Sequence, residues 1–175
     1  MNSLTRRQFI GSSLLAATAL AQAPALLSAE PEQKIKLGLI GCGWYGMVDL
    51  KDAFRAGGVE AIALCDVDSD HLNASAGEVE KLQGSRPRTF KHYEELLSTP
   101  GLEAVIIATP PHWHALQLLA ALRHGLDVYC EKPLSYDIRE GRAMVEAVRR
   151  SGRIVQIGFQ RRQSTAFQAV RHHLE

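Results

Sequence analysis

The sequence predicts an α/β fold built on a doubly wound, mostly parallel sheet. Six short β-branched runs alternate with longer amphipathic runs between residues 34 and 159, and a glycine-rich turn joins the first β-like run to the first helical one. Such alternation implies parallel strands with right-handed crossover connections. The 175 residues, 46% hydrophobic and 22% charged, suffice for about one domain. We therefore expect a Rossmann-type sheet.

Each expected element follows from its local pattern. Strands are predicted where short apolar, β-branched runs occur, at residues 34–40, 59–66, 88–90, 103–109, 127–130 and 153–159. Helices are predicted where apolar residues share one face, at residues 44–56, 69–83, 92–97, 112–125, 138–150 and, as an opening turn, 167–175. Ser69 and Asp137 are the expected N-caps of two of these helices, and Gly84 and Gly152 are the expected stops.

Charge and cysteine content exclude several classes of protein. Lys and Arg number 20 against 19 Asp and Glu, so the chain has no strong field to attract nucleic acid or an anionic membrane surface. Three cysteines, Cys42, Cys65 and Cys130, lie in or beside apolar runs and show no pairing pattern. We interpret them as buried thiols and not as a disulfide scaffold.

Residues 1–30 have the order of an export signal: a basic pair, Arg6 and Arg7, then a modestly apolar run, then small residues. This segment resembles a twin-arginine (Tat) signal, which exports folded proteins. We expect recognition by the Tat machinery and a periplasmic location; the alternative is an amphipathic helix with a chance Arg pair. The apolar run is too short and too polar for a stable membrane span. Cleavage after Ala21, after Ala23 or near Ala29 stays open.

The turn at residues 41–46, Gly-Cys-Gly-Trp-Tyr-Gly, has the form G-x-G-x-x-G. Its context makes it informative, because it follows a predicted strand and opens a predicted helix. Gly41 permits a tight turn, Gly43 lets the backbone approach a pyrophosphate, and Gly46 lets helix and strand pack closely. Trp44 and Tyr45 complete the helix N-terminus, whose free N–H groups favour phosphate. The turn predicts a dinucleotide site.

A carboxylate at the end of the second predicted strand supports the same site. Asp66 lies twenty residues after Gly46, where an acidic side chain accepts hydrogen bonds from ribose hydroxyls. A carboxylate there repels a 2′-phosphate, so NAD is the expected cofactor and NADP the less favoured one.

The loops after the fourth and fifth predicted strands, Thr109 to His114 and Glu131-Lys132-Pro133, bring a family resemblance. Together with the glycine turn and Asp66, they make residues 34–162 similar to the Gfo/Idh/MocA family of glucose-fructose oxidoreductase and inositol dehydrogenase. The resemblance implies that Thr109, Pro110 and His114 line the cofactor crevice. Pro111 stands where the family often has Asn, which removes one contact to the dinucleotide.

The same resemblance implies that Glu131 and Lys132 reach the nicotinamide ribose and the substrate. Lys132 is the expected catalytic residue, because an ammonium beside a carbinol holds the hydroxyl and stabilises a developing alkoxide. Pro133 corresponds to a position where the family's Lys-Pro bond is cis. Gln160 and Arg161 resemble a segment that approaches substrate.

His112 and His114 form a His-x-His pair, for which we reject a metal site. No third ligand of suitable spacing is visible, and a helix N-terminus disfavours a cation. We therefore expect no metal.

The expected organisation is a signal at residues 1–30, a nucleotide-binding domain at 31–162 and the start of a truncated second domain at 163–175. The resemblance implies that the family's second α/β domain is missing from this chain, and that the full-length protein is a homo-oligomer. Three functions remain open: an exported NAD-dependent oxidoreductase for a sugar, polyol or related carbohydrate; an NAD-dependent glycosidase that uses transient oxidation and elimination; and a non-catalytic dinucleotide-binding fragment.

Overall fold

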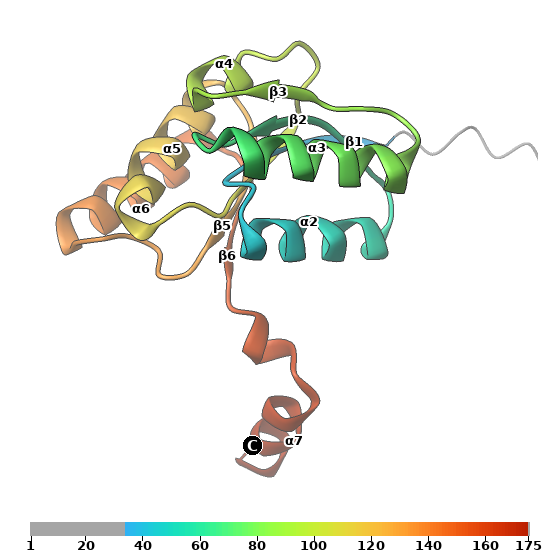
Figure 1. Cartoon of the computed structure of the whole chain (residues 1–175). Coiled ribbons are helices and arrows are strands. Elements are labelled where there is room, and N and C mark those ends of the chain that lie inside the picture. The colour runs from blue at the N-terminus through green and yellow to red at the C-terminus, as the bar shows by residue number, and fades with distance from the viewer. Residues whose placement is uncertain (1–33, 175) are drawn as a thin grey trace, which may run out of the picture. The chain divides into compact units, whose positions relative to one another are not determined.

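A six-stranded sheet is the centre of the protein, whose computed structural model describes residues 34–174 (Figure 1). The strand order is β3-β2-β1-β4-β5-β6, and every neighbouring pair is parallel. β1 lies between β2 and β4, so the chain first winds outward to β3 and then returns across β1 to build the other half. A crevice at such a switch point is where doubly wound sheets bind ligands. The predicted fold class is confirmed.

The bounds of the elements agree with the expected ranges to within two residues. The strands are β1 Ile35–Ile40, β2 Val59–Cys65, β3 Arg88–Phe90, β4 Ala104–Ile107, β5 Asp127–Glu131 and β6 Val155–Gly158. The α-helices are α2 Trp44–Ala56, α3 Ser69–Gln83, α4 Tyr93–Leu97, α5 Pro111–Arg123, α6 Ile138–Ser151 and α7 Thr165–Leu174, and η2 Gln160–Gln163 is a short 3₁₀ helix.

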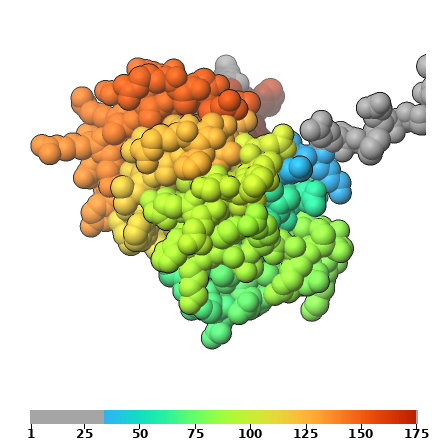
Figure 2. Space-filling model, turned by 90° about the horizontal axis from the view of Figure 1, so that it is seen from above, coloured from blue at the N-terminus to red at the C-terminus, as the bar shows by residue number. Residues whose placement is uncertain are grey.

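Side chains of the central strands alternate between two apolar layers. In β4, Val105 and Ile107 pack in the layer that contains α5 and α6, whereas Ile106 packs with α2 and α3 on the opposite face. Each fully buried aliphatic side chain contributes about 1.5–3 kcal/mol to folding. α4 belongs to the first layer and contacts α5, and the space-filling view shows the yellow-green surface around α4 beside the yellow surface of α5 (Figure 2). Two covered faces explain why β4 is a continuous hydrophobic run.

Helix ends follow the predicted capping chemistry with one correction. Asp137 is the N-cap of α6 and accepts a hydrogen bond from the backbone N–H of Glu140 at 2.9 Å, as expected. For α3 the cap is Asp68 and not Ser69, because the Asp68 carboxylate accepts from the backbone N–H groups of Asp70 and His71. Both residue types cap well, so spacing alone did not separate them.

The three cysteines, Cys42, Cys65 and Cys130, are buried and free, which confirms the interpretation as thiols.

The C-terminal part of the described chain lies outside the sheet. Beyond β6, η2 leads into α7, whose described side chains are exposed. Among the described helices, none combines the length and apolar character needed to cross a membrane. The expected signal, residues 1–30, lies outside the described residues.

Candidate functional site

Two of the three glycines in the turn after β1 are required by the fold itself. Gly41 has φ +95°, and a Cβ there would lie 2.8 Å from the backbone carbon of Ala108. A Cβ on Gly46 would overlap the carbonyl oxygen of Gly41 and lie 3.3 Å from Cβ of Ala108. These positions let α2 begin directly beside the ends of β1 and β4.

Gly43 is different, because no protein atom would meet a side chain there. Its φ of −66° and ψ of −177° suit any residue, and a Cβ there would meet nothing within 4 Å. Gly43 is the N-cap of α2 and also lines the pocket described below. The first amide hydrogens of a helix lack acceptors within the helix, and its N-terminus carries a partial positive charge. The open space at Gly43 therefore fits the diphosphate of a dinucleotide.

Asp66 lies beside the glycine turn and holds it in place. Its Oδ2 accepts a hydrogen bond from the backbone N–H of Cys42 at 2.7 Å, and its Oδ1 accepts from Asp68 N–H at 2.9 Å. The Ser75 hydroxyl donates to the Cys42 carbonyl at 3.0 Å from α3. The structure thus brings the predicted carboxylate and the predicted turn together, and adds a bracing role for Asp66 that the sequence did not show.

A pocket of about 470 Å³ opens at the carboxyl ends of β1, β2 and β4. Five predicted residues line it: Gly41, Gly43, Asp66, Thr109 and Pro110. Trp113, from the first turn of α5, also lines it. The lining residues that the sequence did not identify are Ile40, Cys65, Val67, Lys91, His92, Tyr93, Glu94, Ala108 and Gln117. These include an aromatic wall, because the Tyr93 and Trp113 rings meet edge to face with centroids 6.4 Å apart. A partly apolar pocket beside an acidic strand end suits an adenosine group.

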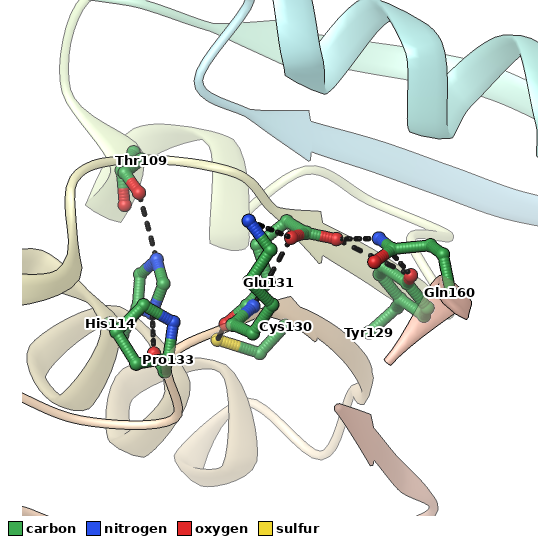
Figure 3. Close-up of polar contacts among 8 residues, drawn as sticks. Thr109, His114, Tyr129, Cys130, Glu131, Pro133 and Gln160 are labelled. Carbon is green, nitrogen blue, oxygen red and sulfur yellow. Dashed lines mark hydrogen bonds and ion pairs between the residues drawn. The ribbon is translucent and has the colours of Figure 1, made fainter. Parts of the chain in front are cut away.

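Glu131 and Lys132 lie at the end of the neighbouring strand, β5, and differ in exposure. Glu131 is 5% exposed, whereas the Lys132 side chain is 54% exposed. The Lys132 backbone N–H donates to Glu131 Oε2 at 3.2 Å, and Lys132 Nζ lies 4.0 Å from the same oxygen (Figure 3). Lys132 Nζ also lies 5.3 Å from the centroid of the Tyr45 ring. The Lys132–Pro133 bond is cis, as expected.

His114 is fully buried and connects two loops, which corrects the expectation that it lines the crevice. One ring nitrogen lies 2.8 Å from the carbonyl oxygen of Thr109 and the other 2.8 Å from that of Pro133 (Figure 3). The Thr109 hydroxyl donates to Gln117 Oε1 at 2.7 Å. His114 therefore fixes the loop after β4 against the loop that carries Lys132. The sequence does not indicate this contact, because His114 and Pro133 lie far apart along the chain.

The other predicted residues take separate positions. Trp44 is 80% exposed and packs edge to face against Tyr45. Gln160 reaches into the sheet, where its amide donates to Glu131 Oε1 and, at 3.0 Å, to the Tyr129 hydroxyl (Figure 3). Arg161 is exposed, and its substrate contact stays a prediction.

Asp49 is a buried acidic residue near the candidate site that the sequence analysis did not identify. It is 8% exposed on α2, and burial together with the charge of Glu131 raises its pKa to about 7. One signal was available: Asp49 follows Gly46 by three residues and therefore shares the helix face that meets the sheet.

The glycine turn, its carboxylate and the pocket at the switch point define a dinucleotide-binding domain of the Rossmann type. Residues 35–159 match the Gfo/Idh/MocA oxidoreductase family with its NAD-binding Rossmann fold, and the chain belongs to this family.

Several curated proteins and solved structures resemble part of this chain. It is 35% identical over 139 residues to a glycosyl hydrolase family 109 protein of Stenotrophomonas maltophilia, covering 75% of this chain and 30% of the relative. It is 30% identical to inositol 2-dehydrogenase 3 of Saccharopolyspora erythraea, covering 78% and 39%. The WlbA dehydrogenase of Bordetella pertussis, solved in complex with NADH and UDP-GlcNAcA, superimposes with a TM-score of 0.72 at 26% identity, covering 81% and 41%. The chain thus spans well under half the length of these proteins.

Proposed function

We propose that this chain is the NAD-binding part of an exported oxidoreductase that acts on a sugar, polyol or related carbohydrate. The observation that carries the proposal is the open space at Gly43 beside Asp66, since no atom of the protein fills it and the first amide hydrogens of α2 face it. Family membership and the inositol dehydrogenase relative support the reaction class and the substrate class. When bound, a nicotinamide dinucleotide would supply the redox chemistry by accepting or returning a hydride.

Cofactor choice depends on two side chains that line the same pocket. Asp66 favours the free ribose hydroxyls of NAD, whereas Lys91 carries the charge that would tolerate a 2′-phosphate. We expect calorimetry on the purified protein to give saturable NAD binding at least tenfold tighter than NADP binding. Absence of saturable binding of either dinucleotide would refute the proposed function.

Lys132 is the residue that we assign to the substrate. Its backbone N–H is bonded to Glu131, while more than half of its side chain is exposed. That position lets it donate a hydrogen bond to a substrate hydroxyl and stabilise negative charge on that oxygen. We expect Lys132→Ala in the intact enzyme to lower kcat at least 100-fold, with the NAD dissociation constant changed less than threefold. Lys51→Ala, which removes a surface lysine paired with Glu78, is the matched control; activity retained in Lys132→Ala contradicts the assignment.

A glycosidase is the second candidate, favoured by the similarity to a glycosyl hydrolase family 109 protein. Such an enzyme reverses its oxidation within each turnover, so no NADH accumulates while aglycone is released. Following NADH absorbance and aglycone release in one reaction separates the candidates: net NADH formation supports the dehydrogenase, and aglycone release without it supports the glycosidase.

Export is proposed from residues 1–30 alone. We expect a reporter fused to this segment to reach the periplasm through the Tat machinery, and Arg6→Lys with Arg7→Lys to hold it in the cytoplasm. Export of the double variant at the wild-type level would remove this part of the proposal. We also propose that the full-length protein is a homo-oligomer, which light scattering can test.

A further inference from the structure

Two acidic side chains meet inside the protein, behind the exposed ammonium of Lys132. Asp49 approaches from α2 and Glu131 from β5, and they are 8% and 5% exposed. Gly158 on β6 closes the space, because a Cβ there would overlap Glu131 Oε1 and lie 2.7 Å from the Tyr129 hydroxyl oxygen. The two carboxyl groups therefore lie in one buried site, and β6 leaves no room there for further side-chain atoms.

Hydrogen-bond donors in this site are unequally distributed. The Gln160 amide, the Tyr129 hydroxyl and the Lys132 backbone N–H all donate to Glu131. Asp49 Oδ2 is buried and has no hydrogen-bond partner among the described residues. The Gln160 amide also interacts with the Asp49 carboxyl and lowers its pKa, but burial and the charge of Glu131 raise that pKa more. A buried charge without a donor is strongly disfavoured, and two adjacent buried carboxylates do not both ionise readily. The missing donor is supplied most simply by a proton on Asp49 itself.

We propose that Asp49 and Glu131 hold one proton between them, and that Asp49 is a positioning residue that keeps the Glu131 carboxylate in place for the Lys132 segment. In this arrangement the neutral Asp49 carboxyl donates to Glu131, and the pair carries one negative charge opposite Lys132. The importance of this charge for cofactor and substrate rests on the proposed function, whereas the shared proton does not.

The charged and titratable groups around Asp49 agree with this assignment. Glu131 and the Tyr129 hydroxyl face it from β5, while Tyr45 and the exposed Asp52 share its helix. Burial first, and then the charge of Glu131, raise the pKa of Asp49 to about 7. Lys132 lies near Glu131 and the Tyr45 ring, and Arg161 interacts with Tyr45. Neither cation is among the causes that shift the pKa of Asp49. Ionisation of Asp49 above neutral pH thus places a second, unbalanced negative charge beside Glu131.

The direct test is a carboxyl-carbon NMR titration of the purified protein without cofactor or substrate. We expect the Asp49 signal to titrate near neutral pH, and its midpoint to fall by at least one pH unit in Glu131→Gln, which removes the neighbouring charge. Asp52→Asn, one turn along the same helix and paired with Arg55, is the graded control: it removes a weaker neighbouring charge and should lower the midpoint less than Glu131→Gln does. An Asp49 midpoint in the ordinary carboxyl range, or one unaltered by Glu131→Gln, overturns the shared proton.

A second measurement tests positioning. The amide of Asp49→Asn can donate to Glu131 at every pH, so we expect this variant to bind NAD with an affinity that does not vary between pH 6 and 9. We expect wild-type affinity to change at least threefold through the Asp49 midpoint. Equal pH dependence in both proteins refutes the positioning role while leaving NAD binding, and hence the proposed function, intact. If Asp49→Asn does not fold, the wild-type and Glu131→Gln titrations still decide the shared proton.

Discussion

Replacing Gly43 by alanine should separate cofactor binding from folding. The added Cβ meets no protein atom within 4 Å, and the backbone angles suit alanine. Alanine is a poorer N-cap than glycine by roughly 0.5–1 kcal/mol, but it restricts the unfolded chain and regains about 0.4–1 kcal/mol. The net change in the free energy of unfolding is therefore within about 0.5 kcal/mol of zero.

Cofactor binding should respond differently, because the methyl group would occupy the space that fits a diphosphate. Loss of one hydrogen bond to a charged group costs about 1.5–3 kcal/mol, which corresponds to an affinity roughly 10- to 150-fold weaker. Urea unfolding and NAD calorimetry on the same preparation measure both quantities. Gly46→Ala is the contrasting variant, since its Cβ overlaps Gly41 and should cost more than about 3 kcal/mol of stability. Undiminished NAD affinity in folded Gly43→Ala would refute the placement of the diphosphate.

Further substitutions test the residues around the turn and the acidic pair. Asp49→Asn should stabilise the protein increasingly as pH rises from about 4 to about 7, because in the wild type the folded state retains a proton that the unfolded Asp loses. A pKa of about 7 against an ordinary 3.8 sets an upper limit of about 4 kcal/mol on this stabilisation. A stability difference between variant and wild type that stays constant over this pH range in urea titrations contradicts the prediction. Asp66→Ala leaves the Cys42 N–H without its acceptor and should cost about 1–3 kcal/mol and weaken NAD binding, whereas the exposed Asp70→Ala serves as control in thermal unfolding and calorimetry. Gly158→Ala should displace Glu131, and a crystal structure of the variant with Glu131 unmoved would count against the tight packing described for β6.

Much of the fold follows from the sequence because its elements are locally encoded. Val105, Ile106 and Ile107 form an apolar run too short for a helix, and glycine positions mark where helices end. The adjacency of Asp66 to the glycine turn was also predictable, because the carboxyl ends of neighbouring parallel strands meet at one edge of the sheet.

The acidic pair and the role of His114 depend instead on contacts between distant segments. Asp49 and Glu131 are 82 positions apart in the sequence, and nothing near either one indicates that the other supplies its environment. His114 was expected to contact the cofactor because it follows a strand end, yet its ring turns inward to two backbone carbonyls. Side-chain direction at a helix start is decided by packing, which the sequence pattern does not encode.

Gln160 has a consequence for how the chain leaves the sheet. It is the first residue of η2, and its amide is bonded to Glu131 and Tyr129 inside the acidic site. These hydrogen bonds fix the position of the chain where it leaves β6. Glu131 is bonded both to Gln160 and to the backbone of Lys132. The orientation of any domain attached beyond α7 would therefore vary together with the position of Lys132.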